Sequence, residues 1–66
     1  MKLIINGEEK IVDKNKSINQ IMVDLEIRDK VMACAVNMDI VKKENWNNFI
    51  PKENDKIELL QFVGGG

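Results

Sequence analysis

The chain of 66 residues contains no histidine, tyrosine or threonine, and it has one cysteine and one serine. Without histidine, neither Ser17 nor Cys34 has the base that usually activates a hydroxyl or thiol nucleophile. A single cysteine also excludes an intramolecular disulfide, and no pair of Cys or His residues offers the spacing of a metal site. We therefore expect a chain that has no catalytic residue and binds no metal.

Long apolar segments are missing as well. No run approaches the roughly 18 apolar residues of a membrane-spanning helix, and the N-terminus lacks the apolar region of a secretory signal peptide. The 10 basic and 11 acidic residues are scattered and give a net charge of −1. A nucleic-acid-binding protein normally has a basic stripe. We expect a cytoplasmic protein that contacts neither membrane nor nucleic acid.

The residues that are present fit a small globular domain. Hydrophobic residues make up 44% of the chain and charged residues 32%, which is ordinary for a folded protein. A chain of this length buries only about 60% of its unfolded surface, so its core is small. Three glycines close the sequence, and glycine has no side chain to pack. We predict one domain over residues 1–63 and a flexible glycine tail over residues 64–66.

The first third of the sequence predicts a hairpin and a helix. Met1 to Ile5 is rich in strand-forming residues, and the pair Asn6-Gly7 that follows favours a tight turn into a strand over Glu8 to Asp13. Ser17 can cap a helix, with Gln20 at the capping-box position. We predict a helix over residues 18–25, whose apolar stripe consists of Ile18, Ile21, Met22 and Leu25.

The remainder predicts three more strands. The apolar run Val31 to Val36 is typical of a buried central strand. A turn at residues 37–39 leads into a short strand at Ile40-Val41, and Lys43 to Phe49 is irregular, with one helical turn. The last strand is expected over Lys56 to Val63. This order favours an α+β roll, with a mixed sheet of five strands and the helix across one face.

Three less common residues have two interpretations each. Cys34 could be a reactive or sulfur-relay thiol, but a free cysteine in an apolar run is usually a small core residue, and we favour packing. Trp46 and Phe49 could stack on a ligand, but in so small a domain we favour their role as a lid on the core.

The last strand suggests a docking patch. Side chains alternate between the two faces of a strand, so Ile57 and Leu59 share one face while Glu58, Leu60 and Phe62 share the other. With Ile57 and Leu59 in the core, Leu60 and Phe62 would be exposed next to the glycine tail. Neighbouring exposed apolar residues often mark an interaction site. We predict that Leu60 and Phe62 dock a partner.

The tail itself allows three interpretations. Glycines can form a linker, which normally connects two segments, or cap a helix, but no helix precedes them here. In the third interpretation the carboxylate of Gly66 reacts after activation as an acyl-adenylate, and residues without a Cβ atom pass into a narrow nucleotide site. Ordering three residues costs roughly 3–6 kcal/mol, which contacts of a docking patch would offset. We favour this third interpretation, a carrier and substrate of an enzyme.

These features resemble the ThiS family, the bacterial sulfur carriers of thiamin biosynthesis. The resemblance rests on Asn6-Gly7 after the first strand, Ser17-Ile18 at the helix start, the middle segment from Val36 to Trp46, and the ending Phe62-Val63-Gly64-Gly65-Gly66. It covers the whole chain, and the glycine ending is its most specific part. It implies the ubiquitin-like β-grasp fold.

The resemblance also implies a reaction sequence and its partners. An E1-like enzyme, ThiF, would adenylate Gly66 with ATP and magnesium, and sulfur from a persulfide donor would convert the adenylate to a thiocarboxylate. The thiocarboxylate would donate sulfur to the thiazole synthase ThiG. Gly64 and Gly65 would be threaded into the enzyme, and Leu60 and Phe62 would face the partner.

Three alternatives stay open at this point. MoaD, the sulfur carrier for molybdopterin, shares the fold and the diglycine ending, although its chains tend to be longer and often have proline before the terminal segment. A ubiquitin-like modifier would form the same adenylate but end in an isopeptide bond. An interaction module with an inert tail is the third alternative.

Overall fold

A computed structural model describes residues 1–62 of the chain. The predicted domain boundary after Val63 and the tail glycines Gly64, Gly65 and Gly66 lie outside the described residues.

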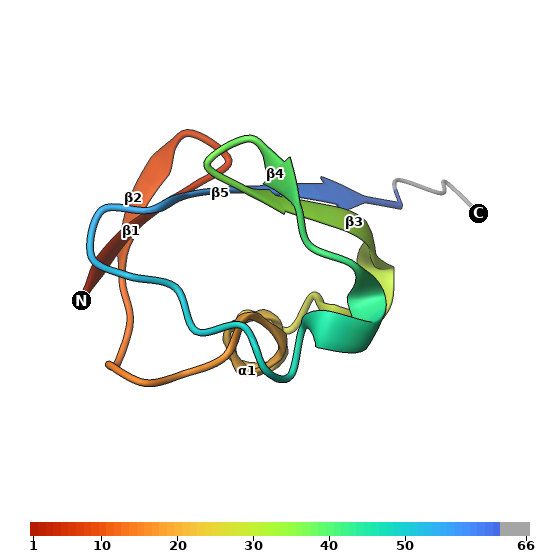
Figure 1. Ribbon diagram of the computed structural model, residues 1–66, viewed down its shortest axis with the longest axis horizontal. Coiled ribbons are helices and arrows are strands. Elements are labelled where there is room, and N and C mark those ends of the chain that lie inside the picture. The colour runs from red at the N-terminus through yellow and green to blue at the C-terminus, as the bar shows by residue number, and fades with distance from the viewer. Residues whose placement is uncertain (63–66) are drawn as a thin grey trace.

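Within residues 1–62 the chain forms one mixed sheet in the order β2-β1-β5-β3-β4. The pair β1–β5 is parallel, and the other three pairs are antiparallel. Helix α1 lies on one side of this sheet, so the predicted α+β architecture with a helix across a five-stranded sheet is confirmed (Figure 1). The strands are β1 (Lys2–Ile5), β2 (Glu8–Ile11), β3 (Val31–Val36), β4 (Asp39–Ile40) and β5 (Lys56–Gln61).

Helix α1 covers Ile18–Asp24 and ends one residue earlier than predicted, with Leu25 as its C-cap. The Ser17 hydroxyl accepts a hydrogen bond from the Gln20 N–H at 3.1 Å, which confirms the predicted N-cap. Three members of the predicted stripe are buried and Leu25 is partly buried against them. The apolar stripe therefore faces the sheet.

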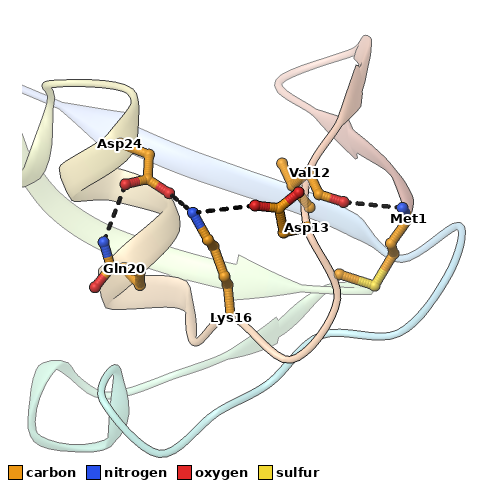
Figure 2. A network of polar contacts seen from close by, with 6 residues as sticks. All are labelled: Met1, Val12, Asp13, Lys16, Gln20 and Asp24. Atoms are coloured by element: carbon orange, nitrogen blue, oxygen red, sulfur yellow. Dashed lines mark hydrogen bonds and ion pairs between the residues drawn. The ribbon is translucent and has the colours of Figure 1, made fainter.

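A polar network fixes the segment between β2 and α1 to the helix. Figure 2 shows the Lys16 ammonium between the carboxylates of Asp13, at 3.7 Å, and Asp24, to which it donates a hydrogen bond. The Gln20 side chain donates a second hydrogen bond to Asp24 at 3.0 Å. These bonds, that from Lys16 above all, lower the pKa of the Asp24 carboxyl below its ordinary value.

Strand β2 ends at Ile11 instead of Asp13, and the next residue, Val12, is hydrogen-bonded to the first residue of the chain. The Val12 N–H donates to the Met1 carbonyl at 2.8 Å. The Met1 ammonium donates to the Val12 carbonyl, also at 2.8 Å (Figure 2). The two apolar residues at the end of this segment, Ile11 and Val12, differ in burial. Ile11 is 79% exposed, whereas Val12 is half-buried against the core.

Strand β3 differs from the predicted buried central strand in two respects. The central strand is β5, and β3 lies between β5 and the edge strand β4. Val31 pairs with Gln61 and Ala33 with Leu60, which leaves Met32 as the extra residue of a bulge. Because of this residue Val31 is buried in the core and Met32 is exposed.

The elements that follow β3 have bounds close to the predicted ones. The turn is Asn37-Met38, so β4 begins one residue earlier than expected, at Asp39. The predicted helical turn is a 3-10 helix, η2, over Lys43–Asn45, and a second one, η1, covers Arg28–Lys30. Strand β5 ends at Gln61, short of the predicted end at Val63.

Trp46 and Cys34 both lie in the core. The Trp46 ring is 1% exposed, its N–H donates to the Val41 carbonyl at 2.9 Å, and Phe49 packs against the same cluster, so the lid interpretation is confirmed. Cys34 is equally buried, which confirms the packing interpretation. The buried core residues are Leu3, Ile5, Ile18, Ile21, Met22, Val31, Cys34, Val36, Val41, Trp46, Ile57 and Leu59.

Candidate functional site

Strand β5 carries the chain from the centre of the sheet toward its C-terminal segment. It pairs with β1 on one side and with β3 on the other. Beyond the strand, the Phe62 N–H donates to the Lys30 carbonyl at 2.6 Å, which continues the bonding on the β3 side by one residue. The last described residue is therefore bound to the backbone of Lys30, the residue before β3.

The two faces of β5 differ as predicted over the described residues. Ile57 and Leu59 are buried on the side of α1, and Glu58 is exposed on the other side. Leu60 is 61% exposed and Phe62 is 60% exposed. The exposure that a docking role for Leu60 and Phe62 requires is therefore present, while the role itself stays a prediction.

Cross-strand pairing extends this apolar surface beyond β5. Ala33 pairs with Leu60, and Ala35 pairs with both Glu58 and Ile40. Residues paired across strands share a face, so Ile40, which is 72% exposed, stands on the same face as Leu60. We call this helix-free side of the sheet the outer face.

A shallow hollow lies in the outer face. Ala33 and Ala35 form its floor because their side chains are small, and Ile40 and Leu60 line it on opposite sides. The remaining lining residues are Asn6, Cys34, Glu58 and Leu59. Alternation within one strand predicted Leu60 and Phe62, but it could not find Ile40 or the alanines, since nothing in the sequence states which strands are neighbours.

Asn6 shapes the hollow by ending β1. Its amide oxygen accepts a hydrogen bond from the Leu59 N–H at 2.8 Å, and its amide nitrogen donates to the Leu59 carbonyl at 3.3 Å. The side chain thus replaces the backbone of β1 where that strand has turned away at φ +50°. The sequence indicated only the turn at Asn6-Gly7. The hydrogen bonds from the Asn6 side chain to β5 join residues far apart in the sequence and leave no local signal.

The one thiol of the chain lies behind the outer face, in the core. Burial raises the pKa of Cys34 to about 11, so the thiol stays protonated at neutral pH and is a poor nucleophile. Among residues 1–62 no three His, Cys, Asp or Glu side chains gather as a metal ion would require. No helix in this part of the chain has the length and apolar character to span a bilayer.

Comparison with known proteins places these features in a family. The ThiS family model matches residues 3–66. The sulfur carrier protein ThiS of Escherichia coli (strain K12) is 27% identical over the full length of both chains. A thiazole synthase of Paramagnetospirillum magneticum is 32% identical over 66 residues; the chain spans 20% of that protein's length.

A solved structure agrees with this assignment. The crystal structure of a thiamine biosynthesis protein (ThiS) from Geobacter metallireducens superposes with a TM-score of 0.78 at 26% identity and covers all of both chains. Since the family model spans nearly the whole sequence and the fold agrees throughout, the chain belongs to the ThiS family of ubiquitin-like β-grasp proteins.

Proposed function

We propose that this chain is a sulfur carrier of thiamin biosynthesis and that Gly66 bears the sulfur as a C-terminal thiocarboxylate. The main support is the match to the ThiS of Escherichia coli, a protein named as a sulfur carrier, over the full length of both chains. Members of the family act as small carriers rather than enzymes, which agrees with a chain that has neither histidine nor a reactive thiol.

The proposed chemistry proceeds in two stages. An oxygen of the Gly66 carboxylate attacks the α-phosphate of ATP, pyrophosphate leaves, and the acyl-adenylate forms. The terminal sulfur of a persulfide then displaces AMP, and reductive cleavage of the new S–S bond by a thiol leaves the thiocarboxylate. ATP and magnesium belong to the adenylating enzyme, an E1-like partner of the ThiF type, while this chain supplies the terminus and the surface that positions it.

The glycines suit the first stage for a steric reason. A terminus that enters a nucleotide site must pass between walls that leave little room, and glycine has no Cβ to collide with them. Gly64 and Gly65 are therefore proposed as the threaded residues, with Leu60 and Phe62 as the first contacts outside the nucleotide site. Leu60 and Phe62 are exposed, and neighbouring exposed apolar side chains often mark an interaction site.

Thiazole synthase is the proposed acceptor of the sulfur. Two proteins named thiazole synthase, from Paramagnetospirillum magneticum and Magnetococcus marinus, match this whole chain over 20% of their own length. A ThiS-like segment joined to such an enzyme would have little distance to travel between loading and delivery. This arrangement favours a ThiG-type partner over an acceptor in molybdopterin synthesis.

Intact mass spectrometry tests the proposal. The chain is incubated with an E1-like adenylating enzyme, magnesium–ATP and a persulfide donor, and we expect a species heavier by the mass difference between sulfur and oxygen, located at Gly66. A matched chain that lacks Gly66 should stay unmodified while its circular dichroism is unchanged. An unmodified full-length chain would contradict the proposal, and a linkage to lysine of another protein would indicate a modifier instead.

A further inference from the structure

We propose that the hollow in the outer face receives one apolar side chain of the enzyme that adenylates Gly66, and that Ile40 on the edge strand β4 is a contact of this enzyme. The inference rests on the proposed function, and it places part of the recognition on a strand that is remote in sequence from the terminus.

The hollow has a volume of about 370 Å³ and is open to the outer face, so it has room for an apolar side chain of a partner. Its floor is made of two alanines that are adjacent on one face of β3, and larger side chains rise on either side of them, Ile40 from β4 and Leu60 from β5. On the third side, beyond the end of β1 at Ile5, Asn6 lines the hollow. Pockets within an interface are where its anchor side chains usually insert.

The polar group that lines the hollow does not oppose such an insertion. Both functional atoms of the Asn6 amide are already hydrogen-bonded to the Leu59 backbone. A partner that covers the hollow therefore need not provide a new hydrogen bond for Asn6, and no unpaired polar group is created on the floor. The charged member of the lining is Glu58, which is exposed. We accordingly expect a basic residue of the enzyme beside the inserted apolar one.

The position of the hollow identifies its occupant. Four residues follow Phe62, and an extended chain of four spans at most about 14 Å. An enzyme that holds the Gly66 carboxylate in its reaction centre must therefore cover the end of β5. Leu60 stands two residues before Phe62, about 7 Å along the strand, so the hollow lies within the area that this enzyme covers. Helix α1 occupies the opposite face of the sheet (Figure 1), which leaves the outer face for the enzyme.

Substitution of Ile40 tests the remote contact. With the chain as varied substrate in ATP–pyrophosphate exchange, Ile40→Ala should raise KM about tenfold and leave kcat unchanged, because it removes binding without altering the tail. Ile11→Ala is the matched control. Ile11 is also an exposed isoleucine of the outer face, on the opposite edge strand β2, and its removal should leave both constants at their wild-type values.

Filling the hollow provides an independent variant. Ala35→Val adds volume to the floor, and valine suits a strand, so the melting temperature should not fall. Its KM should nevertheless rise as for Ile40→Ala. If Ile40→Ala and Ala35→Val both have the same KM as the control Ile11→Ala, the inference is overturned.

The two hypotheses fail in different ways. If the wild-type chain supports no exchange, the proposed function is wrong. If the wild-type chain is active and the hollow variants are equally active, only the inference is wrong. Variants that keep their KM for adenylation but lose binding to thiazole synthase, or lose self-association, would also overturn it, since the hollow would then belong to another partner.

Discussion

The side chain of Asn6 is expected to hold the central strand where its neighbour β1 ends. Its two hydrogen bonds to Leu59 are 2.8 and 3.3 Å long and lie partly shielded from solvent. Each such bond contributes about 1 kcal/mol to the free energy of unfolding. Asn6→Gly removes both hydrogen bonds, while glycine adopts the φ of +50° without strain. We therefore expect the free energy of unfolding to fall by about 2 kcal/mol.

Two further variants separate the contributions at this position. Asn6→Asp keeps the oxygen that accepts from the Leu59 N–H and loses the donor, so its loss should be smaller, about 1 kcal/mol. Asn6→Ala loses both bonds and also places a Cβ in the left-handed region, which adds about 1–2 kcal/mol. In order of decreasing stability we expect the wild type, Asn6→Asp, Asn6→Gly and Asn6→Ala.

Thermal unfolding followed by circular dichroism measures these differences. In a domain of this size 1 kcal/mol corresponds to about 4–8 °C, so Asn6→Gly should melt about 8–16 °C below the wild type. Asn54→Gly is the control for the glycine itself, because Asn54 has φ +70° in an exposed turn and its side chain makes no hydrogen bond among the described residues. Equal melting temperatures for the two glycine variants would refute the argument.

Four other predictions concern single side chains. Met38 occupies the hairpin turn at φ +73°, so Met38→Gly should raise the free energy of unfolding in urea by about 1 kcal/mol; a decrease would show that the turn is not strained. The Cys34 thiol, with its pKa raised by burial to about 11, should resist alkylation near pH 8 until urea unfolds the chain. The lowered pKa of Asp24, held mainly by the hydrogen bond from Lys16, means that this carboxylate adds stability above its unfolded pKa and that the contribution disappears as the pH falls through the lower folded value. Asp24→Asn should therefore lose less stability than the wild type when both are titrated into acid. Phe62→Asp should keep the wild-type melting temperature, because Phe62 is exposed, but it should weaken binding of the adenylating enzyme in titration calorimetry.

Local signals predicted most of the elements. The turn at Asn6-Gly7, the cap at Ser17 and the alternation of Ile57 to Leu60 each depend on residues close in sequence, and each is present in the structure. Such signals describe one segment at a time. The exposure of Leu60 and Phe62 was predicted correctly because it follows from alternation within a single strand.

Features that depend on two segments escaped prediction. The bulge at Met32 exists because the register of β3 against β5 shifts between Val31 and Ala33, and β3 alone gives no sign of it. In the same way, Ile40 becomes a neighbour of Leu60 only through the two alanines between them. The hollow is therefore a property of the assembled sheet.

The proposed docking energy has a magnitude that suits a carrier. Holding residues 63–66 in one extended conformation costs roughly 4–8 kcal/mol relative to a free chain. Complete burial of a large apolar side chain is worth about 1.5–3 kcal/mol, and Ile40, Leu60 and Phe62 have 60–72% of their surface still to bury. Together they would contribute about 3–6 kcal/mol, which offsets most of the cost of ordering the tail and leaves no surplus. A carrier must leave one enzyme to reach the next, so a near balance between tail ordering and apolar contact permits both loading and release.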